Sequence, residues 1–319
     1  MDGKTLSRDL RELLQESGTS SFMDDKTTYD WIYRAACHYA FLTRALTGES
    51  TGTIVQGVRT YSLPVDYLRL YARHNRSDRF FIKINDGVSD SFVFDRAYDA
   101  VQFENNSSQQ AIASSFSVID ALPLTRLTSA VTSTGAVNTP LSGECYLNDT
   151  TGTFLTKVAV GDFVHNPAEG DDGASGVVIA VVSNIKLTCA LFDNASGEPV
   201  GYTSGQTYVI NQQGRYAVYL DPPPLTAGYI ITVPYIRRPA PVYSPYAAYQ
   251  FPGDASLALI LYAAWAYKYR DREPNYGDAM YGHFERAVKI SSHATNRAQV
   301  RRAFHVNFSK RGTSSGSVR

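Results

Sequence analysis

The chain has 319 residues, of which 44% are apolar, and its 30 basic and 30 acidic side chains give a formal net charge of zero. This length has room for roughly two domains, and the charge balance gives no global basic field of the kind that dedicated nucleic-acid binders show. Three cysteines without CxxC spacing, Cys37, Cys145 and Cys189, predict neither a zinc site nor a disulfide framework.

Helical spacing marks the N-terminal part of the chain. Four leucines between residues 6 and 14 share one face of a short helix, and a pair of aspartates opens a longer helix over residues 26–46. Apolar side chains recur along this second helix every three or four residues. Trp31, His38 and Phe41 lie off that stripe, so the helix has apolar groups on more than one side.

The apolar period then changes to two, which is typical of strands. Asn85-Asp86-Gly87 is a strong hairpin signal between two such runs, because glycine tolerates the positive φ that these turns require. Residues 95–103 resemble a short helix. The runs expected to be strands are residues 53–56, 59–63, 67–73, 80–84, 91–94 and 116–119.

The composition changes between residues 122 and 214. This stretch has three bases against eight acids and is rich in Thr, Ser and Gly. Turn clusters separate short β-prone runs at roughly ten-residue spacing, which predicts a small all-β module, sandwich-like or barrel-like. The runs are residues 158–164, 176–182, 185–191 and 207–210.

Two strand-like runs follow, residues 215–220 and 229–236, on either side of three consecutive prolines. The next expected helix has no charged residue between positions 256 and 267. A helix that is apolar all round is buried, and this one falls short of the about 20 residues that span a bilayer. We therefore expect protein to surround it, from its own fold or from neighbouring copies.

A second C-terminal helix is expected over residues 276–296. Residues 297–319 then carry six bases and no acids, which is typical of a flexible arm. Residues 1–10 lack the apolar region of a secretory signal, and no apolar run is long enough for a membrane span. We expect no membrane contact, and a reducing cytoplasm at least until assembly.

These elements together predict an α+β fold. Its core is a helical bundle, made of the N-terminal helices and the C-terminal helix pair, with a small antiparallel β region. Residues 1–121 and 215–300 are expected to form this core domain together, because neither half alone can bury its apolar faces. Residues 122–214 form the inserted β-sandwich or barrel-like module, and residues 301–319 form the basic C-terminal arm.

Three stretches together resemble the head-to-tail adaptor proteins of tailed bacteriophages: RTYSLPVDYLRL at 59–70, RYAVYLDPPPLTAGYIITVPYIRRPAPV at 215–242, and FPGDASLALILYAAWAYKYRDREPN at 251–275. The resemblance covers about two thirds of the chain. Residues 122–214 are inserted where typical adaptors pass directly from strand to strand. The matching positions are Tyr61, Leu63, Pro64, Asp66, Leu68, Leu70, Phe116, Val118, Asp120, Val218, Leu220, Pro222, Pro224, Tyr235, Arg238 and Pro239.

The resemblance implies a structural virion protein with no enzymatic activity and no cofactor or metal. Such a protein forms a ring, usually of twelve copies, that joins the portal protein of the head to the tail tube or nozzle. Phage DNA would pass through the ring without sequence-specific binding. The expected location is the neck of the virion, after assembly in the host cytoplasm.

Two sets of residues are expected to make contacts in such a ring. Helix side chains that pack in the core or against neighbouring copies are Trp31, Tyr33, Phe41, Leu257, Leu261, Trp265 and Tyr269. The second set lies in the arm, where three alternating apolar residues between basic pairs suit a strand added to the portal. It comprises Arg301, Arg302, Phe304, Val306, Phe308, Lys310 and Arg311. A plain solubilising tail and a phosphate-binding arm are the alternatives.

The sequence gives weaker indications of metal binding, catalysis and glycan binding. Residues 169–173, EGDDG, contain calcium-type ligands but do not fit the EF-hand spacing, and a solvated turn is the plainer interpretation. The six histidines are scattered singly, and no GxSxG, Walker A or GxGxxG motif occurs, so an enzyme ranks third. The second-ranked function is a virion-surface module that binds glycans through Tyr146, Phe163, Tyr202 and Tyr208.

Overall fold

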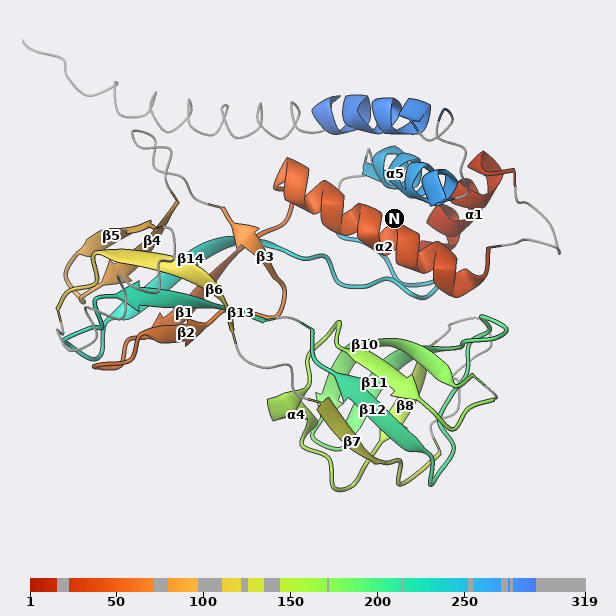
Figure 1. The fold of residues 1–319 in the computed structure, drawn as a ribbon, viewed down its shortest axis with the longest axis horizontal. Coiled ribbons are helices and arrows are strands. Elements are labelled where there is room, and N and C mark those ends of the chain that lie inside the picture. Colours follow the sequence, from red (N-terminus) through yellow and green to blue (C-terminus); the bar gives the residue numbers. More distant parts are fainter. Residues whose placement is uncertain are drawn as a thin grey trace, which may run out of the picture.

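A computed structural model describes residues 1–15, 23–71, 80–96, 111–121, 126–134, 144–170, 172–213, 215–251, 255–270, 275 and 278–290. Within this part of the chain, an eight-stranded sheet and a layer of helices lie side by side, and a six-stranded sheet lies beneath the helices in the view of Figure 1.

The larger sheet combines strands from both ends of the sequence. Its order is β1-β14-β4-β5-β6-β13-β2, with β3 paired to β14. All neighbours are antiparallel except β5 and β6, which run parallel. The strands are β1 (Thr47–Thr53), β2 (Thr60–Ser62), β3 (Tyr67–Leu70), β4 (Phe81–Asn85), β5 (Asp90–Asp95), β6 (Ser115–Ala121), β13 (Arg215–Asp221) and β14 (Ile230–Arg237).

The turn between β4 and β5 confirms the expected hairpin. Gly87 adopts a φ of +94°, and the Asp86 carboxylate accepts hydrogen bonds from the N–H groups of Val88 at 2.8 Å and Ser89 at 2.7 Å. Strand β6 confirms the expected strand at 116–119. The short helix expected over 95–103 falls mostly on residues 97–110, which lie outside the described part of the chain.

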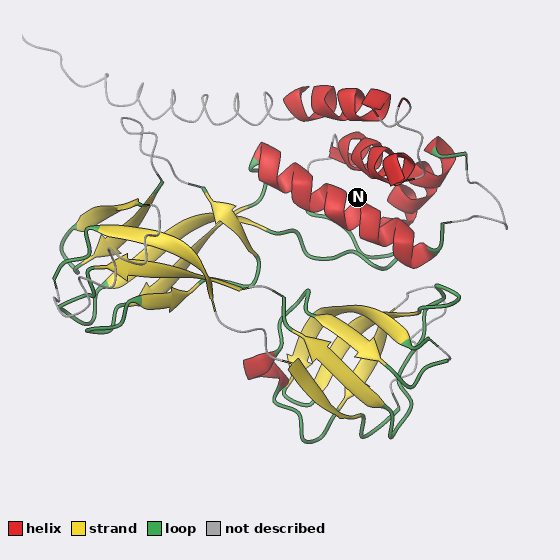
Figure 2. Cartoon of the chain, viewed as in Figure 1, coloured by secondary structure: helices red, strands yellow, loops and turns green. Residues whose placement is uncertain are grey.

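The predicted fold class is wrong. The described chain is mostly β, with fourteen strands in two curled sheets, and is not a helical bundle with a small β region (Figure 2). Strand β1, TGESTGT, explains part of the error because it carries no apolar side chain and so has no apolar alternation. It nevertheless pairs with β14 over seven residues, Thr47 opposite Ile236 to Thr53 opposite Ile230, so backbone hydrogen bonding defines this strand.

The smaller sheet curls into a barrel in the order β7-β12-β9-β10-β11-β8. Beyond the end of β7, the N–H of Thr132 donates to the carbonyl of Asn148 at 2.9 Å, and Ser133 bridges Asn148, which joins the first strand to the last. Its elements are β7 (Arg126–Ala130), β8 (Glu144–Asn148), the short helix α4 (Phe154–Lys157), β9 (Phe163–Asn166), β10 (Ala174–Ser183), β11 (Lys186–Asp193) and β12 (Thr207–Asn211).

The barrel strands β10, β11 and β12 confirm three of the expected runs. The fourth run, 158–164, was placed too early, because Gly161 turns the chain at a φ of +93° and the strand begins only at Phe163. Strand β6 pairs with β13, with Ala121 opposite Arg215, so the two ends of the 122–214 segment lie on adjacent strands. The chain therefore leaves and re-enters the larger sheet at one place.

The helical layer consists of α1 (Gly3–Leu13), α2 (Asp25–Thr43), α5 (Ala255–Arg270) and a further helix over residues 278–290 (Figure 1). Asp2 caps α1 by accepting from the N–H of Thr5 at 2.7 Å, and Asp24 caps α2 by accepting from Thr27 at 2.5 Å. Fully buried side chains of this layer include Leu6, Leu10, Ile32, Ala36, Leu259 and Phe284.

Candidate interaction surfaces

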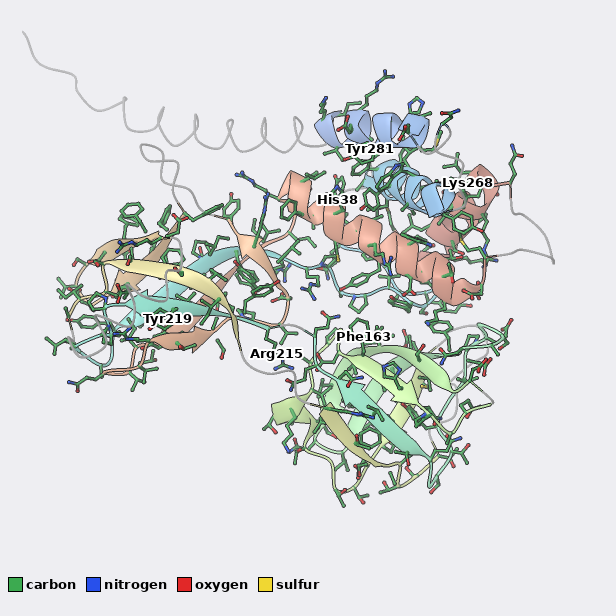
Figure 3. The ribbon with its side chains drawn as sticks, viewed as in Figure 1. His38, Phe163, Arg215, Tyr219, Lys268 and Tyr281 are labelled. Carbon is green, nitrogen blue, oxygen red and sulfur yellow. The ribbon has the colours of Figure 1, made fainter. Side chains whose placement is uncertain are left out.

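The helices meet in a cluster of aromatic side chains. The ring of His38 on α2 stacks on Tyr262 of α5 with centroids 4.7 Å apart, and lies 5.7 Å from Phe284. Trp265 lies 5.2 Å from Tyr262 and 4.9 Å from Tyr281, which joins α5 to the last helix. His38 and Tyr281 mark the two sides of this cluster in Figure 3. Burial lowers the pKa of His38, so the ring is neutral near pH 7.

The structure separates the predicted helix contacts into buried and exposed groups. Leu261 is buried at 7% exposure, while Leu257, four residues earlier on the same helix, is 58% exposed. Trp31, Tyr33 and Trp265 are partly buried. Within the described residues, the chain's own fold therefore covers α5 at Leu261 but not at Leu257. The side chain of Tyr269 and the entire arm, including Arg301, Arg302, Phe304, Val306, Phe308, Lys310 and Arg311, lie outside what the structure describes.

Large apolar side chains are exposed on the described surface of the helices. Phe41 and Leu42 at the end of α2 are 38% and 41% exposed, and Ile290 is 68% exposed. The guanidinium of Arg69 covers one face of Phe41, with its central carbon 3.8 Å from the ring centroid. Leu42 and Ile290 were not among the sequence candidates. The described fold leaves Leu42 and Ile290 largely in contact with water, and their burial against another surface would be favourable.

The barrel also exposes apolar groups, at one end. Leu155 of α4, Val182 of β10 and Ile185 in the β10–β11 turn are each about half exposed. They are neighbours, because the N–H of Phe154 donates to the carbonyl of Asn184 at 3.1 Å and the N–H of Leu155 donates to the Asn184 side chain. The sequence pattern did not single them out, since each belongs to an ordinary β-prone or helical run.

The barrel contacts the helical layer through its own apolar cluster. Val177, Ala190 and Phe192 of the barrel pack with Tyr29 of α2 and with Tyr243. Lys26 adds a hydrogen bond from Nζ to Ser175 Oγ at 2.9 Å, and the Tyr243 hydroxyl donates to Asp30. Burial raises the pKa of Asp30, partly offset by this hydrogen bond. The barrel is thus held on α2 as well as by its two connecting strands.

A buried carboxylate lies where the barrel joins the larger sheet. Asp162 is fully buried and accepts from the N–H groups of Ala159 at 2.8 Å and Gln213 at 3.0 Å. Arg215 Nη2, at the start of β13, lies 3.3 Å from Asp162 Oδ2. Figure 3 places Arg215 between the barrel and the sheet. Gln213 also accepts from Arg238 at the end of β14, so one polar network connects the three segments.

The described residues offer little for catalysis or metal binding. Among them, no group of three or more His, Cys, Asp or Glu side chains is arranged to hold a metal ion. All three cysteines are free, and burial raises the pKa of Cys145 to about 12, so this thiol is unreactive at neutral pH. In the acidic loop, Glu169 already accepts from Gln206 at 3.0 Å, and Asp171 lies outside the described residues.

The four aromatic residues considered for glycan binding do not form one surface. Tyr202 and Tyr208 are buried in the barrel core, with the Tyr208 hydroxyl donating to Asp149 at 2.7 Å. Phe163 is half exposed, and Lys186 lies over the ring of Tyr146 at 3.7 Å. A sugar-binding platform would need adjacent exposed rings, which these positions do not provide.

No protein-family model matches this chain, and a search of curated proteins finds no match either. None of the described helices is long and apolar enough to cross a membrane.

Proposed function

We propose that this chain is a structural, non-enzymatic adaptor subunit that forms a ring between the portal of a phage head and the tail. DNA passes through the ring, and the location is the virion neck after assembly in the host cytoplasm. The sequence resemblance at 59–70, 215–242 and 251–275 supports this assignment. The observation that carries the proposal is the set of exposed apolar side chains on the helical layer, at Leu42, Leu257 and Ile290.

These side chains support assembly for an energetic reason. Burial of a large aliphatic side chain contributes roughly 1.5–3 kcal/mol, so several together stabilise contact with a neighbouring copy. Rings arise when one surface of a subunit binds a different surface of the next and the rotation closes. Exposed apolar groups on the helices provide one such surface on the core domain.

We also propose that residues 122–214 are a module inserted into a core domain made of 1–121 and 215–300, followed by the arm 301–319. In this proposal the core domain forms the ring, and the arm docks on the portal through Phe304, Val306 and Phe308. The second-ranked glycan module gains no support, because two of its four aromatic residues are buried in the barrel.

Substitutions on the exposed helix surface test the proposal. Leu257→Asp and Ile290→Asp place a charge where a neighbouring copy would pack, so each should abolish ring formation in sedimentation velocity while the circular dichroism of the subunit stays unchanged. Val88→Asp is the matched control, since Val88 is fully exposed at the tip of the β4–β5 hairpin. Rings that form equally well with all three variants would refute the proposed interface.

A further inference from the structure

A cavity of about 480 Å³ lies where the helical layer, the end of β14 and the barrel meet. Its walls are largely apolar, with Leu46, Val65, Pro239 and Pro241 among them, and Val160 contributes from the barrel side. The cavity is thus large enough for a small organic molecule or for a few residues of a peptide.

Two arginines line this cavity and form no ion pair with the described residues. Among the described residues, neither Arg237 nor Arg238 has a carboxylate within ion-pair distance. Asp66 also lines the cavity, but its Oδ1 accepts from the Tyr235 hydroxyl at 2.9 Å. Arg238 donates to the neutral side chain of Gln213. With Asp66 counted, the two guanidinium groups still leave a net positive charge in a partly enclosed, mostly apolar space.

Two residues of the cavity wall carry unsatisfied donors. The Nε of Arg237 and the hydroxyl of Tyr249 are both buried and have no hydrogen-bond partner among the described residues. Tyr249 is only 4% exposed. The backbone of Val242 is close enough to affect the pKa of Tyr249. Its geometry relative to the hydroxyl is nevertheless not that of a hydrogen bond. A buried donor without a partner is unfavourable, and a bound acceptor would remove this cost.

We propose that this cavity binds a carboxylate group attached to an apolar body. A carboxylate suits the planar guanidinium fork, it accepts from Arg237 Nε and from the Tyr249 hydroxyl, and the proline and aliphatic walls cover the apolar part. The carboxylate comes either from a small organic acid or from an acidic side chain of a peptide. Both sources present the same chemistry, and the test separates them.

The binding experiment uses the full-length protein and isothermal titration calorimetry. The probes are sodium benzoate, inorganic phosphate and a short peptide, capped at both ends, that contains glutamate and proline. We expect benzoate, the peptide or both to bind, and phosphate to bind neither as tightly nor at the same site. Binding by the peptide alone identifies a protein ligand, and binding by benzoate alone identifies a small acid.

Substitutions test whether the probes bind in this cavity. Arg237→Gln should weaken it roughly tenfold or more, because a hydrogen bond to a charged group contributes about 1.5–3 kcal/mol. Tyr249→Phe should weaken it less, and Ala240→Trp, at an exposed position on the cavity wall, should block entry while keeping both charges. Lys83→Gln on the exposed face of β4 is the charge-matched control and should bind like the wild type.

The inference is overturned if no carboxylate probe binds the wild-type protein, or if phosphate alone binds. It is also overturned if Arg237→Gln and Ala240→Trp bind as tightly as the wild type while their melting temperatures show that they are folded.

Discussion

Asp162 shows how a single side chain connects two parts of this molecule. Its buried carboxylate satisfies the N–H groups of Ala159 and Gln213 and lies 3.3 Å from Arg215. Asp162→Ala leaves two buried N–H groups without acceptors, so we expect it to lower the free energy of unfolding by about 2–4 kcal/mol. Urea denaturation measures this. Asp172→Ala, at an exposed position in the barrel, is the control and should change the value by less than about 0.5 kcal/mol. Equal effects would contradict the role given to Asp162.

His38 makes the stability of the folded chain depend on pH. Burial lowers its pKa below the usual value of 6.5. As the pH falls through 6.5, the unfolded chain therefore takes up a proton that the folded protein does not, and stability decreases. His38→Phe keeps an aromatic ring beside Tyr262 and removes this titration. Its urea midpoint should fall less than that of the wild type between about pH 7.5 and about pH 5.5.

The pH dependence will not vanish in that variant. Burial, and then the positive charges of Lys26 and Arg126, lower the pKa of His165 in the same direction. The double variant, His38→Phe with His165→Gln, should therefore show a smaller change of the urea midpoint with pH than His38→Phe alone. If the urea midpoint depends on pH as strongly in both variants as in the wild type, neither histidine is buried as the structure places it.

At the scale of elements, helix α5 has one face in the core and one face in solvent. Leu261→Ala should cost about 2–5 kcal/mol of subunit stability, because it leaves a cavity in the helical core. Leu257→Ala, one turn earlier, should cost less than about 0.5 kcal/mol in the subunit, because this side chain is exposed. Thermal unfolding of the isolated subunit compares the two, and a smaller loss for Leu261 than for Leu257 would mean that the helix is rotated.

The sequence predicted elements whose apolar residues follow a clear period and failed at those whose partners lie far along the chain. Helix α2, the β4–β5 hairpin and strands β10 to β12 carry local signals. Strand β1 has none, and β7 and β8 were missed because RLTSA and ECYLN alternate too briefly to stand out. Pairings such as β1 with β14 join residues almost two hundred positions apart, which no local pattern specifies. The predicted fold class therefore contained too much helix and too little strand.

The interaction surfaces were harder to predict than the core. Apolar residues on α5 were recognised from the sequence, but which of them face solvent depends on how α1, α2 and the last helix surround them. In the sequence, Arg238 was singled out only as a matching position of the adaptor resemblance, and Arg237 was not singled out. Their position beside Tyr249, and the absence of a carboxylate partner among the described residues, follow from the folded chain alone.

At the scale of the whole molecule, the arm from residue 301 to 319 is expected to fasten the subunit to the portal. Six bases without acids occur in residues 297–319, and the alternating Phe304, Val306 and Phe308 need a partner to bury them. Deleting residues 300–319 should leave subunit stability nearly unchanged and abolish co-sedimentation with the portal.

Raising the salt from ~0.1 to ~0.5 M should weaken binding of the full-length protein to the portal only in part, since screening acts mainly on exposed charges. Full binding by the truncated protein would contradict this role.

We propose that this chain assembles into a ring on a portal. Electron microscopy of the purified protein mixed with its portal tests it most directly. We predict a closed ring seated on one face of the portal, with the helices of neighbouring copies in contact and particles that lose the ring when Leu257→Asp replaces the wild type. Monomers beside bare portals, under conditions where the subunit is folded, would contradict the account.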